Sequence, residues 1–427
     1  MKIRWWYFPA GLGGAVVVAC ILFIFAFYLY AYANIVAMGF VLKGHKHYDN
    51  GEYEEAVKWY DRALSLRPFI ARGHFHYDKG KALAKLGRYE EALELYDEAL
   101  PYLKDSDIAF IVYEKRADAL AHLGRWEEAV EDYGHSIDRT PTSRANDPSS
   151  AGDAEYDEEN YAKAIAYFEA AAETDPDDSA LKFKLGVSWL ALGFCEKAVS
   201  YFDDATELAP DDGLAWNYKA WTLGLTGRYE TALECADRAL ALDADDPNAW
   251  ITKGKILILA GDAGGARRCF DRGSAQDPSS AEALSSMGLT YFVEAKYDEA
   301  RPYYERLTGP GGSPYGLIFL YLIDRAEGRP GAARLQPLLD APPYPWLGRL
   351  CRFLSGGISA DDLLAAAEGD RMSTCEAHFF IGYINKLDGD DAAARRHFEE
   401  AVAVGRYEQA EYSLARYELA RTRGAGE

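Results

Sequence analysis

Residues 185–210 read LGVSWLALGFCEKAVSYFDDATELAP, and their pattern recurs along residues 179–278. An alanine returns every 34 residues, at positions 198, 232, 266 and 300, and a glycine does the same at positions 193, 227 and 261. A fixed period of this length is typical of an array of stacked structural units, each packed on its neighbours. The chain is therefore predicted to be a repeat protein rather than a set of separate globular domains.

Within one unit, small and aromatic residues occupy regular positions. In the first insertion-free unit these positions hold Leu185-Gly186, Trp189, Gly193, Ala198, Phe202, Ala205 and Pro210. This spacing resembles the tetratricopeptide repeat (TPR), a helix–turn–helix unit of about 34 residues. The resemblance covers most of the chain and implies an all-α fold, a right-handed superhelical solenoid of paired helices. It implies little about function.

The repeat pattern and its interruptions predict the domain organisation. A short basic and aromatic tail (1–7) and a transmembrane helix (8–32) precede repeats 1–3 (37–141), an irregular turn with a degenerate repeat 4 (142–178), repeats 5–8 (179–308), a Gly/Pro break with a degenerate repeat and short helices (309–372), and a TPR-like repeat with a C-terminal capping helix (373–427). Asp147 and Pro148 are expected to begin the first helix of repeat 4, and Ser359 with Asp362 to form a capping box.

The N-terminal 42 residues contain a long uncharged stretch. Residues 5–42 hold no Asp, Glu, Lys or Arg, and residues 15–30 read AVVVACILFIFAFYLY. About 20 apolar residues suffice to cross a bilayer. Aromatic residues flank the run on both sides, as in the aromatic belts of membrane-spanning helices. We therefore expect a single span over residues 8–32 that runs almost directly into the first repeat.

Two alternatives compete with this span. A cleaved signal peptide normally has a shorter apolar region of about 7–15 residues followed by a polar cleavage site. The sequence Val17-Val18-Ala19-Cys20 resembles a bacterial lipobox, in which Cys20 would carry the lipid, but residues 21–32 remain apolar after it. The basic tail, with Lys2 and Arg4, favours an N-terminus inside the cell. The repeats are then expected on the extracytoplasmic side of the cell membrane.

Composition argues against nucleic-acid binding. The formal net charge is −22, whereas nucleic-acid-binding proteins present basic stripes that neutralise phosphates. Most acidic residues lie in the turns between repeats, where they are expected to cap the following helices. The six cysteines include no C-x-x-C pair, which argues against a zinc site or a thioredoxin-like motif.

The sequence contains no motif for catalysis. The sequence has no G-x-S-x-G, H-E-x-x-H or phosphate-binding loop. His45, His47, His74 and His76 are paired at i,i+2, which points the two rings of a pair to different sides of a helix. We therefore predict no enzyme activity, cofactor, metal or small-molecule substrate.

Binding of proteins or peptides is the function that the TPR resemblance implies. In this family the first helix of each repeat, helix A, lines a concave groove, and its positions 2, 5, 9 and 12 face the ligand. The candidate peptide-binding groove then comprises Phe183, Asn217, Trp221, Ile251, Lys255, Ile258 and Phe292. Repeats 2 and 3 supply secondary groove candidates, namely His74, Tyr77, Lys81, Glu114 and Asp118. The first set is a mostly apolar strip that would suit an amphipathic peptide, unless these residues pack against their own neighbours or a second copy.

The C-terminal part also resembles bacterial envelope TPR proteins of the NlpI type. The matching residues are Gly357-Ile358-Ser359, Leu363-Leu364, Cys375-Glu376-Ala377-His378-Phe379, Phe398, Ala401-Val402, Glu411 and Leu419. Proteins of that type are envelope adaptors, which the resemblance implies here as well. The sequence thus favours a membrane-anchored TPR scaffold, with a lipid-anchored NlpI-type adaptor or an accessory subunit of an envelope enzyme as alternatives.

Overall fold

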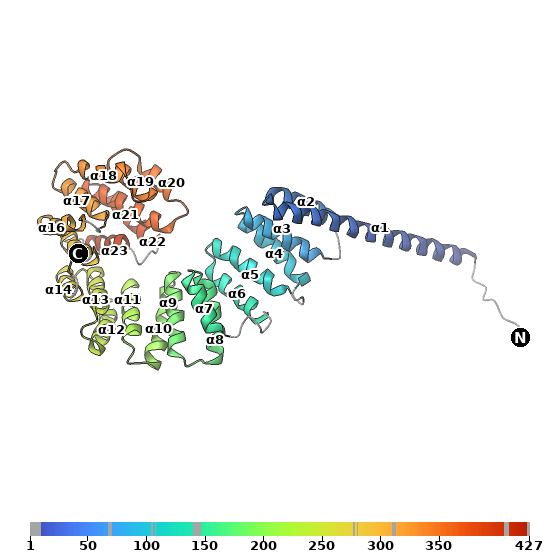
Figure 1. Ribbon diagram of the computed structural model, residues 1–427, viewed down its shortest axis with the longest axis horizontal. Helices are drawn as coiled ribbons and strands as arrows, with labels where there is room; N and C mark the ends of the chain where they lie inside the picture. Colours follow the sequence, from blue (N-terminus) through green and yellow to red (C-terminus); the bar gives the residue numbers. More distant parts are fainter. Residues whose placement is uncertain are drawn as a thin grey trace. The chain divides into compact units, whose positions relative to one another are not determined.

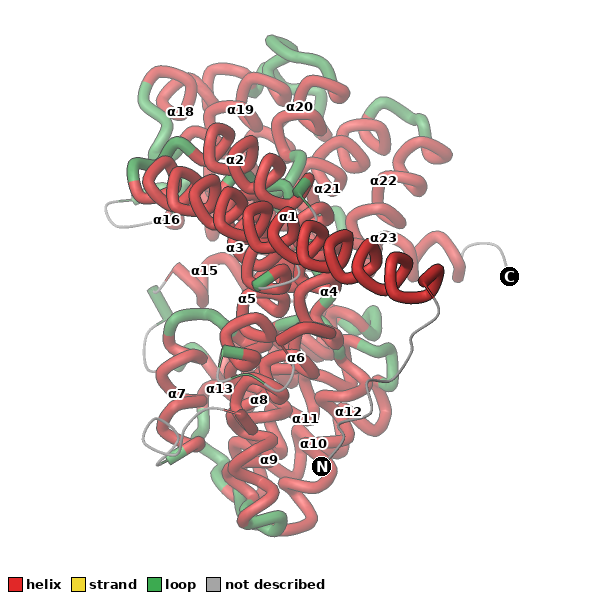
Figure 2. The backbone as a smooth tube through the Cα atoms, turned by 90° about the vertical axis from the view of Figure 1, so that its right-hand side faces the viewer, coloured by secondary structure: helices red, strands yellow, loops and turns green. Residues whose placement is uncertain are grey.

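The chain is helical throughout the part that its computed structural model describes, which comprises residues 10–66, 71–103, 106, 108–139, 147–275, 278–279, 281–309, 313–404 and 410–424 (Figure 1). Within these residues the helices are joined by loops and turns and no strand occurs (Figure 2). The chain divides into two compact units, Met1–Pro176 and Asp177–Glu427. The division falls inside the segment 142–178, where the repeat pattern is irregular.

The first unit consists of helical hairpins that follow the N-terminal helix. Its helices are α1 (Ala10–Asp49), α2 (Tyr53–Ser65), α3 (Arg72–Lys85), α4 (Tyr89–Leu103), α5 (Ala109–His122), α6 (Trp126–Arg139), α7 (Pro148–Asp157) and α8 (Tyr161–Thr174). Each odd-numbered helix packs against the next even-numbered one as the A and B helices of a repeat. The seven residues of the predicted N-terminal tail, and Phe8 and Pro9 of the predicted span, lie outside the described residues.

Helix α1 joins the predicted span to the first repeat without a break. It is 40 residues long, and its C-terminal part packs against α2 as helix A of repeat 1. Ile21, Leu22 and Phe23 are 60–73% exposed on it. The side chains of residues 10–18 lie outside the described part. Among the side chains that are described, no helix carries an apolar stretch long enough to cross a membrane.

The second unit begins with four regular repeats and ends with less regular helices. Its helices are α9 (Ser179–Ala191), α10 (Cys195–Leu208), α11 (Gly213–Leu225), α12 (Tyr229–Leu242), α13 (Pro247–Leu259), α14 (Ala263–Gly273), α15 (Ala281–Val293), α16 (Tyr297–Leu307), α17 (Tyr315–Ala326), the 3₁₀ helix η1 (Ala332–Leu335), α18 (Gln336–Asp340), α19 (Pro345–Leu354), α20 (Ala360–Ala367), α21 (Arg371–Leu387), α22 (Asp391–Val404) and α23 (Ala410–Gly424). Consecutive helices pack as A and B helices in α9–α10, α11–α12, α13–α14, α15–α16 and α21–α22, whereas α17 packs on the short helix η1.

The 34-residue period reflects the way in which helix A packs against helix B within each repeat. At Gly254 an added Cβ would lie 2.6 Å from the ring of Phe270, and at Gly186 it would lie 2.6 Å from Phe202. Only glycine lets the aromatic ring of helix B approach the backbone of helix A this closely. The A-to-B turn is equally specific, since Gly227 has a φ of 84° and Gly261 a φ of 88°, a left-handed conformation that glycine adopts at little cost.

The predicted helix caps are confirmed. Asp178, Asp212 and Asp246, again 34 residues apart, each accept hydrogen bonds from the first backbone N–H groups of α9, α11 and α13. Asp147 caps α7 with Pro148 in its first turn, and Ser359 forms a capping box with Asp362 on α20. These carboxylates satisfy backbone donors that the helix itself leaves unpaired and stabilise the helix dipole.

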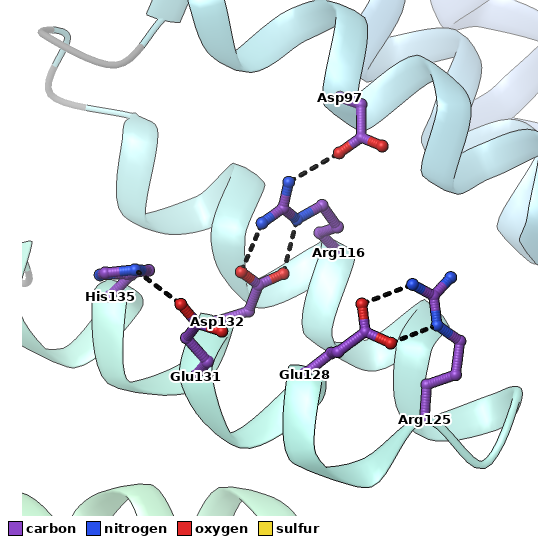
Figure 3. Close-up of polar contacts among 7 residues, drawn as sticks. All are labelled: Asp97, Arg116, Arg125, Glu128, Glu131, Asp132 and His135. Atoms are coloured by element: carbon purple, nitrogen blue, oxygen red, sulfur yellow. Dashed lines mark hydrogen bonds and ion pairs between the residues drawn. The ribbon is translucent and has the colours of Figure 1, made fainter.

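A buried ion pair links three helices of the first unit. The Arg116 guanidinium of α5 donates two hydrogen bonds of 2.6 Å to the carboxylate of Asp132 on α6 and a third, also 2.6 Å, to Asp97 on α4 (Figure 3). Asp132 is only 2% exposed. The bidentate geometry matches the guanidinium plane to the carboxylate, so this pair joins the two helices of repeat 3, and the bond to the exposed Asp97 connects them to repeat 2.

Candidate protein-binding surfaces

The candidate groove residues of the second unit lie on four successive A helices. We call the side of α9, α11, α13 and α15 that carries them the helix-A surface. Phe183 on α9 is half-buried, with its ring 5.2 Å from that of Tyr218 on α11 in an edge-on contact. Lys255 on α13 is exposed, and its Nζ lies 6.0 Å from the ring of Trp221 and 3.6 Å from Glu282. Trp221 and Ile251 are half-buried.

Three of the seven candidates are covered by the protein itself. Asn217 is 7% exposed, Ile258 1% and Phe292 2%. Phe292 packs between the rings of Phe319 and Tyr383, each 5.1 Å away. The side-chain oxygen of Asn217 accepts no hydrogen bond from the described residues. In this conformation the accessible part of the helix-A surface is therefore Phe183, Trp221, Ile251 and Lys255.

In the first unit, the secondary candidates belong to a network of ion pairs. Lys81 lies 3.1 Å from Asp78 and 4.8 Å from the ring centre of Tyr77. Glu114 pairs with Lys163 at 3.2 Å. Asp118 accepts hydrogen bonds from Lys115 (2.8 Å) and from the hydroxyl of Tyr133 (2.9 Å). Because these charges already pair within the unit, a ligand here would have to replace existing contacts.

The C-terminal helix α23 packs against the helix-A surface, which the sequence pattern did not predict. It was expected only to cap the last repeat, yet besides α21 and α22 it contacts α13 and α15 (Figure 1). Tyr412, Leu414 and Ala415 are at most 2% exposed and belong to the same core cluster as Ile258 and Phe292. The chain therefore supplies part of the cover over its own candidate groove.

Arg416 fixes the register of α23 on α11. Its guanidinium donates to the backbone carbonyl of Leu225, in the last turn of α11, and to the hydroxyl of Tyr229 at 3.2 Å. A cation at this position pairs with the negative end of the α11 dipole. The sequence signal for the contact is weak, since Tyr412 and Arg416 merely share one helix face at i,i+4.

Helix α23 also buries acidic side chains. Glu411 is 6% exposed and lies near Glu376 of α21, which accepts hydrogen bonds from the hydroxyl of Tyr315 (2.8 Å) and from the indole of Trp346 (2.7 Å). Burial, with the charge of Glu376 as a second cause, raises the pKa of Glu411 to about 8. Burial likewise raises the pKa of Glu376, against the effect of its two donors. At neutral pH the site therefore holds at least one protonated carboxyl group.

A separate pocket of about 500 Å³ lies on the other face of repeats 5 and 6. Residues of α10, α11 and α12 line it, together with Arg228 just before α12, and its lining includes Trp216, Lys219 and Arg238. Lys219 pairs with Asp203 at 2.8 Å and stacks over Trp216 at 4.8 Å. The described residues contain no group of three His, Cys, Asp or Glu side chains arranged to hold a metal ion.

Comparison with known proteins agrees with the helical hairpins and their packing. Two tetratricopeptide repeat models match the chain, one over residues 41–108 and 77–143 and the other over residues 155–221 and 225–289. Together these matches cover more than half of the 427 residues. The chain matches no curated protein.

The chain is also similar to solved structures, of which three follow. PilW, a type IV pilus biogenesis factor, is 21% identical over 48% of this chain and 97% of its own, with a TM-score of 0.43. Yeast Tom70 is 16% identical over 92% and 97% of the two chains (TM-score 0.41), and Pseudomonas aeruginosa pilF is 16% identical over 48% and 95% (TM-score 0.39). Because tetratricopeptide repeat models match more than half of its residues, this chain belongs to the tetratricopeptide repeat family.

Proposed function

We propose that this protein is a scaffold that binds segments of partner proteins on the helix-A surface of its second unit and has no catalytic activity of its own. The docking of α23 is the observation that carries this proposal. A helix of the chain itself already lies on this surface, with apolar residues in the shared core and Arg416 at the end of α11. A surface that accepts one helix in this way has the shape and chemistry to accept another.

We also propose that residues 8–32 anchor the scaffold in the cell membrane, with the repeats on the extracytoplasmic side. The uncharged run of residues 5–42 supports this proposal, and so does the exposure of Phe23 (73%) and Phe25 (61%) on α1. Large exposed apolar side chains on one continuous helix need an apolar environment. The direct passage from α1 into repeat 1 would hold the repeats close to the bilayer surface.

Mass spectrometry of the mature protein, extracted from membranes, tests the anchor. We expect an intact N-terminus and recovery in the membrane fraction after alkaline washing, because a spanning helix is not released by high pH. A chain that begins at a diacylated Cys20 would show a lipid anchor instead, and a chain that begins after residue 32 would show a cleaved signal peptide. A double variant, Phe23→Lys plus Phe25→Lys, should lose membrane recovery, since each lysine near the bilayer centre costs about 3 kcal/mol.

Partner capture tests the scaffold proposal. The variant Trp221→Ala plus Lys255→Glu removes the aromatic ring and reverses the exposed charge of the helix-A surface. We expect recovery of cross-linked partners to fall about tenfold or more relative to the wild-type chain, because buried aromatic anchors contribute about 2 kcal/mol or more to such interfaces. Quantitative mass spectrometry of proteins cross-linked to the full chain in its own cells provides the measurement.

A matched control uses the same residue types on the same two helices. Trp216 lines the pocket on the other face, and Lys253 of α13 pairs with Asp237 of α12. The variant Trp216→Ala plus Lys253→Glu should capture partners as the wild-type chain does. Equal loss in both variants would indicate a folding defect, which circular dichroism would reveal. Unchanged capture by the Trp221 and Lys255 variant would show that partners do not use the helix-A surface.

A further inference from the structure

Helix α23 contacts the helix-A surface in the way that a bound ligand does. Arg416 reaches the carbonyl of Leu225, which lies 191 residues earlier in the chain, and Tyr229, which lies 187 residues earlier. By contrast, neighbouring repeats pack through their own A and B helices. Helix α23 therefore contacts the regular repeats α9–α16 through side chains that are not part of the repeat pattern.

The buried apolar side chains of α23 define the ligand. Tyr412, Leu414 and Ala415 are at most 2% exposed, and Tyr417 is 8% exposed. All four share a core cluster with Ile258 of α13 and Phe292 of α15. Removing these side chains from water stabilises docking through the hydrophobic effect, and the same apolar surface would be uncovered if α23 left.

The polar contacts of α23 make its docking weaker than that of an ordinary core helix. Glu411 (6% exposed) is buried near Glu376, and Glu418 (3% exposed) is buried beside Lys386 at a distance of 2.6 Å. Burial of a charged or protonated carboxyl group costs free energy that a buried apolar side chain does not. A helix of similar shape without these acids would bind the same surface more tightly than α23 does.

We propose that α23 is an internal ligand of the helix-A surface and that the partner is a helix that displaces it, with aromatic and aliphatic side chains at the spacing of Tyr412, Leu414 and Tyr417 and an arginine one turn after the first aromatic residue. This inference rests on the proposed scaffold function, to which it adds the class of partner and a means of regulation. While α23 is docked, only a helix that competes with it gains access to the part of α13 that α23 covers.

A labelled peptide of residues 408–424 serves as the probe. Its binding is measured by fluorescence anisotropy against two full-length chains, the wild type and Arg416→Glu. In the variant, the glutamate faces the Leu225 carbonyl in place of the arginine, so its own α23 should leave the surface while the surface itself stays intact. We expect the wild-type peptide to bind the variant chain at least about tenfold more tightly than the wild-type chain, because docked α23 reduces the fraction of binding-competent molecules.

The matched control is the same peptide with Arg416→Glu, which should bind neither chain. Equal affinity of the wild-type peptide for the two chains, or binding to neither, would overturn the proposal. Circular dichroism shows whether the Arg416→Glu chain keeps its helices. Exchanging the charges of the Lys386–Glu418 ion pair provides a second test. The Lys386→Glu chain should bind the peptide that carries Glu418→Lys more tightly than the wild-type peptide.

Hydrogen exchange of the wild-type chain decides the question if the variants do not fold. We expect the amides of α23 to exchange together and faster than those of α13 and α21, and to exchange faster still when the 408–424 peptide is added, because local release precedes global unfolding. Exchange of α23 at the rate of α13, unchanged by the peptide, would show that α23 is a fixed part of the core.

These outcomes separate this inference from the proposed function. Suppose that the peptide binds the Arg416→Glu chain more tightly, but partner capture does not depend on Trp221 and Lys255. Then α23 is an internal ligand, and the scaffold role is wrong. If partner capture depends on Trp221 and Lys255 but the peptide binds both chains equally, the scaffold role stands. In that case α23 is not an internal ligand.

Discussion

Replacing Glu411 by glutamine should remove most of the pH dependence of α23 docking between pH 5 and pH 8. In the docked helix the pKa of Glu411 is raised to about 8 by burial and then by Glu376, whereas an exposed glutamate titrates near 4.3. At a pH between these two pKa values, Glu411 is protonated when α23 is docked and ionised when α23 is released. Docking is therefore strongest below about pH 4, weakens as the pH rises, and reaches its minimum above pH 8.

The size of this effect is roughly 3–5 kcal/mol, because each unit of pKa difference corresponds to about 1.4 kcal/mol. The groups that act on Glu411 or surround it are Glu376 of α21, Asp370 at the start of α21, Tyr304 of α16, Tyr315 of α17 and Tyr344 before α19. Burial raises the pKa of the three tyrosines above 10, so they stay neutral below pH 8. Glu376 is the group that titrates with Glu411.

Hydrogen exchange of α23, corrected for the intrinsic pH dependence of amide exchange, measures the free energy of release from pH 5 to pH 8. Glu411→Gln should flatten most of the slope, and Glu411→Gln with Glu376→Gln should flatten the remainder. Asp361→Asn on α20, an exposed carboxyl group, is the control and should keep the wild-type slope. A wild-type slope in the Glu411→Gln chain would contradict a buried, protonated Glu411.

Truncation of Asp132 should destabilise the first unit by about 3 kcal/mol or more. Asp132→Ala leaves the Arg116 guanidinium without the carboxylate that accepts two of its 2.6 Å hydrogen bonds. Removing one partner of a buried pair costs more than the pair itself contributes, because the remaining charge stays desolvated. The loss should be measurable as faster hydrogen exchange of α5 and α6, with α13 and α14 of the second unit unchanged.

Glu128→Ala is the matched control, since Glu128 pairs with Arg125 in the same view of α5 and α6 (Figure 3). The side chains of Arg125 and Glu128 are about half exposed, at 48% and 54%. Ion pairs that are exposed in this way contribute about 0–1 kcal/mol to stability. A double variant, Arg116→Met plus Asp132→Leu, should recover much of the loss because it leaves no buried charge. Similar losses for Asp132→Ala and Glu128→Ala would show that the Arg116 pair is not desolvated.

Local chemistry explains why so much of the repeat architecture is readable from the chain. Several residues are each required by one local interaction within a repeat. Examples are Gly254 opposite Phe270, Gly261 in its left-handed turn, and Asp246 at the start of α13. Such contacts recur at a fixed interval, so a pattern in the residues is enough to locate them. The same repeat register predicts that Phe183, Trp221 and Lys255 face a ligand.

The fate of the other groove candidates depends on contacts that span the second unit. Ile258 and Phe292 occupy ligand-facing positions by repeat register, yet they are 1% and 2% exposed because α17, α21 and α23 return to the A helices. Glu411 and Glu376 stand 35 positions apart in the chain and belong to different helices, and nothing in their spacing indicates a shared burial. The sequence by itself determined the repeats, their caps and the uncharged N-terminal run, since these follow from interactions between near neighbours. Only the tertiary structure decided what covers the helix-A surface, because that cover is made by contacts between residues up to 191 positions apart.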